Sequence, residues 1–404
     1  MPKNTSRRSG SAVSKPATRT ASAGGVGRVR TKFFHEKGNP FRLRCGAELE
    51  GFTLAYETYG ELNADRSNAV LVFHAMTGSQ HAAGLNTSVP GLDGRWIEEV
   101  HEGWWDAFIG PGKAIDTRKF FVICANHLGG CYGSTGPASI RESTGMPWGA
   151  AFPPLRMCDI VDSQMKLIDH LGIGTLHAAV GASIGGYLCL SLATRYPDRV
   201  RTVIPIATGA ETTVLQRLMN FEQIAAIELD PNFRGGDYYG RTPPHDGLAA
   251  ARRIAHKTFV SLQDLRARAR SEVAFNTSPF GWYEMNHPVE SYLLHQGVKF
   301  VSRFDANTYL RILDAWQWFD LAAEGGADNL GEIFLRCSAQ KFLVFSIDSD
   351  VSFDPEEQAG LVRLLENARV PVTWITVHSG KGHDSFLLEP GLFSPHIAQI
   401  LNAR

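Results

Sequence analysis

Short runs of consecutive apolar residues alternate along this chain with segments in which apolar residues recur every three or four positions. The runs predict strands, and a continuous run such as 69–73 is typical of a strand buried on both faces. The segments with helical spacing predict helices. Strands are expected at 52–59, 69–73, 120–125, 176–180, 200–207, 341–347 and 372–377, and helices at 158–171, 184–196 and 355–368. This alternation predicts an α/β protein with a mostly parallel sheet covered by helices.

The alternation stops between residues 209 and 334, where the pattern predicts mainly helices and loops. Helical segments are expected there at 215–227, 247–258 and 308–322. The simplest organisation is one α/β core, formed by residues 33–208 and 335–404, with a helical insertion at 209–334 that covers it as a lid.

Charge separates the first 32 residues from the rest of the chain. The 404 residues carry 40 Lys and Arg against 41 Asp and Glu, so no basic excess favours a nucleic-acid or membrane-surface partner. Residues 1–32 contain eight basic residues, no acidic residue and few large apolar ones, which predicts a disordered tail. An organelle transit peptide also fits this composition. No window is long and apolar enough for a transmembrane helix.

A G-x-S-x-G motif is the strongest chemical signal. Gly181, Ser183 and Gly185 lie between an expected strand and an expected helix, which is the setting of a nucleophile elbow. The two glycines permit a turn sharp enough to expose the serine hydroxyl at the carboxyl end of the sheet. We therefore expect Ser183 to be a nucleophile, although a structural glycine-rich turn would have the same pattern.

A serine nucleophile needs a histidine base and a carboxylate that orients the base. In elbow folds the order along the chain is serine, acid, histidine. Asp350 follows the expected strand 341–347, and His383 lies beyond the strand 372–377, so both are expected at the carboxyl edge of the sheet. Asp348 remains an alternative acid and His378 an alternative base.

The oxyanion of an acyl transfer needs two N–H donors. One donor is expected from Ile184, which directly follows the nucleophile. The second is expected from the loop after the strand 69–73, where Met76 or Thr77 is the candidate. His74, in the same loop, is interpreted as a structural residue because one imidazole base suffices for the mechanism.

The chain resembles the homoserine O-acyltransferase family of α/β-hydrolase-fold enzymes, from about residue 40 to the C-terminus. The resemblance rests on several specific stretches in the same order. They are Gly-Trp-Trp-Asp at 103–106, the stretches 109–117 and 128–137, Val-Glu-Ser-Tyr-Leu at 289–293, Arg-Phe-Asp-Ala-Asn at 303–307 and Gly-His-Asp at 382–384.

The resemblance implies acyl transfer from acyl-CoA, usually acetyl-CoA, to the hydroxyl of L-homoserine, an early step toward methionine. It supports the triad and places the family's oxyanion-loop threonine at Thr77. It also implies that Arg252 and Asp384 bind the acceptor. Members of the family are typically cytoplasmic homodimers that pair through the helical insertion. Acetyl-CoA is expected as a co-substrate, without a cofactor, a metal ion, a nucleic acid or a membrane as partner.

Two positions bear on specificity. The family typically has a tyrosine where this chain has Phe259, so a hydroxyl able to contact the substrate is missing. Relatives that resemble succinyl-CoA users tend to carry arginine where this chain has Ser352, which favours an acetyl donor. A succinyl donor, serine as acceptor, ester hydrolysis by the same triad and a non-catalytic binding protein remain the alternatives.

Overall fold

The structure is a computed structural model, and it describes residues 25–92, 94–271 and 280–403. Its centre is an eight-stranded sheet in the order β1-β4-β8-β5-β11-β12-β13-β14. The strands are β1 (Lys32–Glu36), β4 (Phe52–Tyr59), β5 (Ala69–Phe73), β8 (Phe121–Ala125), β11 (Leu176–Ala182), β12 (Val200–Ile206), β13 (Lys341–Ile347) and β14 (Val372–Val377). The six strands from β8 to β14 run parallel, whereas β4 is antiparallel to both of its neighbours. The predicted mostly parallel sheet is therefore confirmed.

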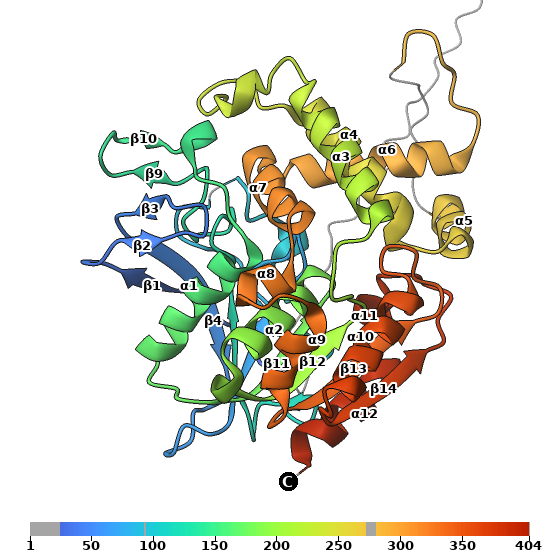
Figure 1. Cartoon of the computed structure of the whole chain (residues 1–404). Coiled ribbons are helices and arrows are strands. Elements are labelled where there is room, and N and C mark those ends of the chain that lie inside the picture. The colour runs from blue at the N-terminus through green and yellow to red at the C-terminus, as the bar shows by residue number, and fades with distance from the viewer. Residues whose placement is uncertain (1–24, 93, 272–279, 404) are drawn as a thin grey trace, which may run out of the picture.

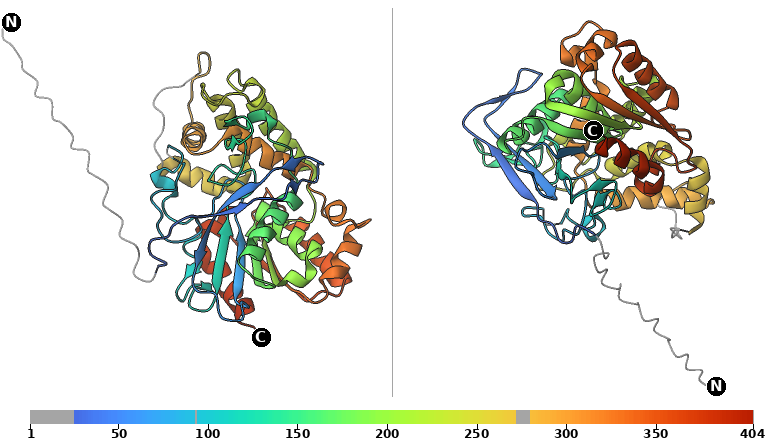
Figure 2. Two further views of the ribbon diagram at one scale, coloured as in Figure 1. Left: turned by 90° about the vertical axis from the view of Figure 1, so that its left-hand side faces the viewer. Right: turned by 90° about the horizontal axis from the view of Figure 1, so that it is seen from below.

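Helices cover both faces of this sheet. Helices α1 (Met157–His170), α2 (Ile184–Arg195) and α10 (Pro355–Asn367) share a core with Leu71 of β5, whereas α12 (Pro390–Asn402) packs on the opposite side with Val70 and Val72. Successive residues of β5 thus point to different faces, and both faces are apolar, as the continuous apolar run predicts. The N-terminal and C-terminal strands form the two edges of the sheet (Figures 1 and 2).

The segment between β12 and β13 is helical. It contains α3 (Val214–Glu228), α4 (His245–Phe259), α5 (Leu262–Ser271), α6 (Pro288–Val301), α7 (Ala306–Gln317), α8 (Leu321–Gly325) and α9 (Leu330–Phe334). Helices α3 to α6 lie together above one end of the sheet (Figure 1). Helices α8 and α9 instead pack near α2 and α10, with Leu321 and Phe334 fully buried. The lid is thus formed by the first part of the predicted insertion.

The helix expected at 308–322 is two helices. Helix α7 ends at Gln317, and the side chain of Asp320 accepts a hydrogen bond from the N–H of Ala323, which caps the start of α8. An aspartate at this position satisfies a free helix N–H group and so starts a new helix. The apolar periodicity alone does not reveal this break.

Part of the predicted disordered tail is ordered, which corrects the boundary at residue 32. The N–H of Val29 donates to the carbonyl of Leu85 at 3.0 Å, and the hydroxyl of Thr31 donates to Glu57 at 2.8 Å. Lys32 already belongs to β1, which pairs with β4. These backbone and side-chain partners, far away in the chain, order residues whose composition alone predicts disorder. Residues 1–24 lie outside the described residues. None of the helices in the described ranges has the length and apolar character needed to cross a membrane.

Candidate active site

Ser183 occupies a strained turn between β11 and α2. Its φ of 58° and ψ of −129° lie in a region that residues other than glycine rarely adopt. A Cβ atom at Gly181 would lie 2.2 Å from the carbonyl oxygen of Gly185, and one at Gly185 would lie 2.5 Å from the carbonyl oxygen of Phe73. Both positions therefore need glycine, because the backbone segments approach too closely for a side chain. This geometry is the nucleophile elbow expected from the motif.

His383 and Asp350 form a buried pair. The Nδ1 atom of His383 lies 2.6 Å from Oδ2 of Asp350, and each residue is only 3% exposed. The other carboxylate oxygen accepts the N–H groups of Ser352 and Phe353 at 2.8 and 2.9 Å. Nδ1 therefore donates to the carboxylate, which leaves Nε2 of His383 to act as the base.

Burial alone would lower the pKa of His383, but the charge of Asp350 and its hydrogen bond outweigh this effect, so the pKa is raised. The imidazole stacks on Phe353, with ring centroids 5.3 Å apart, and the ring of Phe259 lies tilted to it at 6.3 Å. The carboxylate thus stabilises the imidazolium that forms when His383 takes a proton.

The alternative acid and base pair with each other. Nδ1 of His378 lies 2.8 Å from Oδ2 of Asp348, and Oδ1 of Asp348 accepts the N–H of Ser379. The side chain of His378 is 83% exposed, so this pair lies at the surface. The geometry therefore favours Asp350 and His383 over Asp348 and His378.

The loop that carries His383 is fitted to the lid. Gly382 has a φ of +75°, and a Cβ atom there would lie 2.6 Å from the backbone nitrogen of Ser261. The N–H of Asp384 donates to the carbonyl of Phe259 at 2.8 Å, and Nζ of Lys381 lies 2.9 Å from Oδ1 of Asp264. Lid residues at the end of α4 and just beyond it therefore help to fix the position of the base.

Ser183 and His383 line one cavity of about 280 Å³ beneath the lid. The predicted residues Thr77, Arg252 and Asp384 line the same cavity. No hydrogen bond joins Ser183 to His383 in the described part of the chain, so the serine–histidine hydrogen bond remains a prediction for the substrate complex. Among the described residues there is no group of three or more His, Cys, Asp or Glu side chains suited to a metal ion.

One of the two predicted sources of oxyanion donors lines this cavity, and the other, Ile184, directly follows the cavity residue Ser183 without lining the cavity itself. Ile184 is the first residue of α2, and N–H groups in the first turn of a helix have no partner within it. Met76 and Thr77 line the cavity, and their N–H groups have no acceptor among the described residues. The N–H of Gly78 donates to the carbonyl of Ala75 at 3.0 Å, so this loop is a tight turn. The arrangement can bind a negatively charged oxygen.

His74 is a structural residue, as predicted. Its Nδ1 atom lies 2.7 Å from the carbonyl oxygen of Ala75, and its ring stacks on that of His127 with centroids 3.5 Å apart. Burial lowers the pKa of His74 to about 4, so the ring is neutral at physiological pH.

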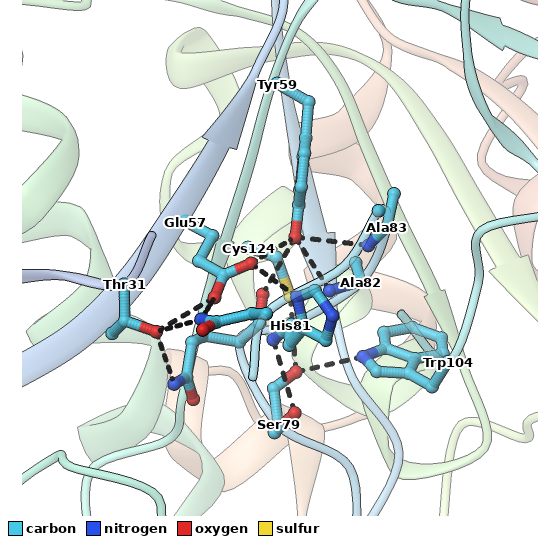
Figure 3. Close-up of polar contacts among 12 residues, drawn as sticks. Thr31, Glu57, Tyr59, Ser79, His81, Ala82, Ala83, Trp104 and Cys124 are labelled. Atoms are coloured by element: carbon cyan, nitrogen blue, oxygen red, sulfur yellow. Dashed lines mark hydrogen bonds and ion pairs between the residues drawn. The ribbon is translucent and has the colours of Figure 1, made fainter. Parts of the chain in front are cut away.

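A buried polar cluster around Glu57 holds the far end of the oxyanion loop (Figure 3). The carboxylate is fully buried and accepts hydrogen bonds from Thr31 at 2.8 Å, Asn86 at 2.8 Å and the hydroxyl of Tyr59 at 2.9 Å. Nδ1 of His81 lies 2.7 Å from the same carboxylate. The cluster joins the N-terminal segment, β4 and the loop after β5.

His81 has an oxygen beside each ring nitrogen. Its Nε2 atom lies 2.9 Å from the carbonyl oxygen of His101, opposite the contact with Glu57. The ring thus links the buried carboxylate of Glu57 to the backbone at His101. Sequence reasoning missed both residues, because a glutamate within a predicted strand gives no signal that it is buried.

Arg252 and Asp384, the residues predicted to bind the acceptor, are both partly accessible where they line the cavity. The guanidinium carbon of Arg252 lies 5.1 Å from the ring centre of Phe259 and 5.0 Å from that of Phe300. Burial raises the pKa of Asp384. Phe259 therefore offers the face of its ring to a cation at the position where the expected hydroxyl is missing.

Arg303 is a further cavity residue to which the sequence assigned no role. It lies between α6 and α7, and its Nη1 atom donates to the hydroxyl of Tyr132 at 3.1 Å and to the carbonyl of Thr77 at 3.4 Å. Its only sequence signal was its place in the matched stretch 303–307.

Comparisons with known proteins identify the fold and the family. A profile of the alpha/beta hydrolase fold matches residues 68–390. The chain is 43% identical to a homoserine O-acetyltransferase of Methanohalobium evestigatum over 91% of this chain and 72% of that protein. It is 42% identical to a homoserine O-succinyltransferase of Cellvibrio japonicus over 91% of this chain and 94% of that protein.

The chain belongs to the homoserine O-acyltransferase family of α/β-hydrolase-fold enzymes. It is an acyltransferase. The crystal structure of homoserine O-acetyltransferase from Bacillus anthracis is 27% identical, with a TM-score of 0.81, and the match covers 93% of this chain and 98% of that one. The crystal structure of esterase E22 is 26% identical, also with a TM-score of 0.81, and the match covers 93% of this chain and 100% of that one.

Proposed function

We propose that this protein transfers an acetyl group from acetyl-CoA to the hydroxyl of L-homoserine through an acetyl-serine intermediate. The observation that carries the proposal is the placement of Ser183 and the Asp350-bound His383 on one cavity beneath the lid. The homoserine acyltransferases among its relatives support the acceptor. The product would serve methionine biosynthesis, as the family resemblance implies.

In the first half of the reaction, Oγ of Ser183 attacks the thioester carbonyl carbon while Nε2 of His383 takes the hydroxyl proton. The N–H groups of Ile184 and of Met76 or Thr77 stabilise the oxyanion. The carbon–sulfur bond then breaks, and CoA leaves with the proton from His383. The product of this half is an acetyl ester on Ser183.

In the second half, the homoserine hydroxyl attacks the acetyl-serine carbonyl, and His383 takes its proton. The same donors hold the oxyanion until the bond to Ser183 breaks and His383 returns a proton to the serine. Arg252 and Asp384 lie in the cavity and can pair with the carboxylate and the ammonium group of an amino acid. Binding of this kind raises the effective concentration of homoserine above that of competing water.

The space near Ser352 supports an acetyl rather than a succinyl donor. Ser352 lines a small chamber of about 20 Å³. This chamber adjoins the main cavity, since both are lined by Met76, Phe259 and Trp316. A chamber of this size has room for about one water molecule or methyl group. No arginine stands at position 352 to pair with a second carboxylate.

Hydrolysis is the second candidate, favoured by the similarity to esterase E22. One experiment separates the two activities. The protein is incubated with acetyl-CoA or succinyl-CoA, alone and with homoserine or serine, and CoA release and acylated products are measured. We expect continued CoA release over many turnovers only with acetyl-CoA and homoserine, together with O-acetylhomoserine, whereas acetyl-CoA alone should give a single burst of CoA. An equal steady-state rate of CoA release without an acceptor would establish hydrolysis and contradict the proposal.

Ser183→Ala is expected to abolish both CoA release and acetyl-enzyme formation while leaving the circular dichroism spectrum unchanged. Ser302→Ala, at an exposed residue after α6, is the matched control and should retain full activity. Ping-pong kinetics with parallel double-reciprocal lines are expected, whereas a required ternary complex would contradict the acetyl-serine intermediate.

We further propose that the protein forms a homodimer through α3. This helix carries an exposed apolar stripe, with Val214, Leu218 and Phe221 respectively 75%, 58% and 65% exposed. The residues lie on one side at the spacing i, i+4, i+7, and an apolar stripe of this kind favours burial against another protein surface. A second copy of the chain could cover it by two-fold symmetry.

Leu218→Glu should convert a dimer to a monomer in sedimentation velocity, because it would bury two charges at the symmetric contact. Ile140→Glu is the control, since Ile140 is 59% exposed and lies outside the lid. A monomeric wild-type protein, or a Leu218→Glu variant that remains dimeric, would contradict pairing through α3.

A further inference from the structure

Two arginines from different parts of the lid meet at the catalytic cavity. Arg252 belongs to α4, and Arg303 lies between α6 and α7. Their guanidinium carbons lie 5.0 and 5.2 Å from the ring centre of the same residue, Phe300. Both arginines line the cavity together with Ser183. Two positive charges therefore share one small space beside the nucleophile.

Neither guanidinium forms an ion pair with a carboxylate in the described part of the chain. Arg252 contacts the rings of Phe259 and Phe300, and Arg303 donates to two uncharged oxygens, those of Tyr132 and Thr77. Burial lowers the pKa of Arg252, and the charge of Arg303 lowers it further. Partly buried cations without a counter-charge are costly, so this arrangement favours an anionic ligand.

The acidic side chains of the cavity leave this positive charge incompletely balanced. Glu99 lines the cavity but already pairs with Nζ of Lys299 at 3.1 Å. Asp384 is the second acidic residue of the cavity. Its charge acts on Arg252, but the two side chains form no ion pair. Two cationic groups and one carboxylate match a zwitterion better than a neutral alcohol.

We propose that Arg303 is a second carboxylate-binding residue that, together with Arg252, receives the α-carboxylate of the acceptor. This inference rests on the proposed function and deepens it. The planar guanidinium groups can donate paired N–H bonds to the carboxylate oxygens, while Asp384 takes the ammonium group. The acceptor class is thereby narrowed to hydroxylated α-amino acids, and amino alcohols that lack a carboxylate are rejected.

Arg303 also holds the carbonyl of Thr77, so its loss could act through the oxyanion loop instead. The two roles affect different halves of the reaction. A carboxylate contact acts on the acceptor half, whereas a displaced oxyanion loop slows formation of the acetyl-enzyme as well. Measuring both halves therefore distinguishes ligand binding from positioning of the loop.

The experiment compares wild type, Arg303→Met and Arg303→Lys. Acetyl-enzyme formation is followed as the burst of CoA release from acetyl-CoA, and kcat/KM is measured with homoserine, 3-aminopropan-1-ol and 4-hydroxybutanoate. Arg253→Met is the matched control on α4, because Arg253 does not line the cavity. Circular dichroism verifies folding. If Arg303→Met does not fold, the same burst rate and acceptor preferences measured on Arg303→Lys test the proposal.

We expect Arg303→Met to reduce the ratio of kcat/KM for homoserine to that for 3-aminopropan-1-ol by about 10- to 100-fold. This is the usual effect of losing a hydrogen bond to a charged group. The burst rate and the preference for homoserine over 4-hydroxybutanoate should remain unchanged, and Arg303→Lys should lose less selectivity. Arg253→Met should match wild type.

Three results would overturn the inference. One is an unchanged acceptor preference in Arg303→Met, and a second is a burst rate reduced as much as overall transfer. The third is a raised KM for acetyl-CoA but not for acetyl-pantetheine, which would show that Arg303 binds a phosphate of the donor. Failure of the proposed function is separate, because wild type would then not acetylate homoserine at all.

Discussion

The imidazole of His383 and the carboxylate of Asp350 lie 2.6 Å apart, although 33 positions separate them in the chain. They follow β14 and β13, which are parallel neighbours in the sheet. The carboxyl ends of neighbouring parallel strands lie at the same edge, so the two loops meet there. This pairing distinguishes Asp350 from Asp348, which lies two residues away and binds a different histidine.

The contrast between these two aspartates gives a matched test. Asp350→Asn is expected to lower kcat by roughly 10³- to 10⁴-fold, because the amide cannot hold His383 in the tautomer that leaves Nε2 as the base. Asp348→Asn should change kcat by less than about twofold, since its partner His378 is exposed. Steady-state kinetics on both variants measures the difference. A larger loss in Asp348→Asn would reverse the assignment of the acid.

The pH profile should report the state of His383. The base must be neutral to take the serine proton, and its pKa is raised above the ordinary 6.5 because the charges of Asp350, Asp384 and Glu357 together outweigh its burial. Activity is therefore expected to fall as the pH decreases through a value above 6.5. Measuring kcat/KM between about pH 5 and 9 gives this acidic limb.

Asp350→Asn should move the same limb to lower pH, because the largest positive contribution to the pKa of His383 is then removed. The residual activity of the variant is sufficient for this measurement if the burst of CoA release is followed. A limb that remained in place would indicate that another group controls the pH dependence.

The close packing of the elbow predicts a sharp difference between two glycines. Gly185→Ala should give little folded or active protein, because the new Cβ atom would lie 2.5 Å from the backbone oxygen of Phe73, which cannot move away freely. Gly174→Ala is the control, since no atom lies within 4 Å of a Cβ at that position. Thermal unfolding and specific activity test both variants. Wild-type stability in Gly185→Ala would show that the turn is looser than described.

The buried pair of Glu57 and His81 should contribute to stability. Glu57→Gln removes a buried carboxylate that accepts several hydrogen bonds, and it is expected to lower the free energy of unfolding by about 3 kcal/mol. Urea denaturation measures this change, and Glu50→Gln at an exposed position is the control. An unchanged unfolding midpoint in Glu57→Gln would mean that these contacts contribute little to the stability of the protein.

The sequence determined much of the sheet and the order of the triad. The strands 52–59, 69–73, 341–347 and 372–377 begin and end where their patterns predict. For 69–73 and 341–347 the reason is burial, which constrains nearly every residue of a strand in the sheet interior. The nucleophile elbow was predictable because Gly181 and Gly185 are required by local backbone crowding. Such constraints act on neighbouring residues, so a linear pattern records them.

Only the tertiary structure decided which distant side chains meet. The choice of Asp350 over Asp348 depends on which carboxylate reaches His383 from the neighbouring strand. The burial of Glu57 and the meeting of Arg252 with Arg303 depend on loops and lid helices that pack together from remote parts of the chain. A charged residue has the same sequence signature whether it lies on the surface or in a cavity, because its surroundings arise from packing rather than from its neighbours in the chain.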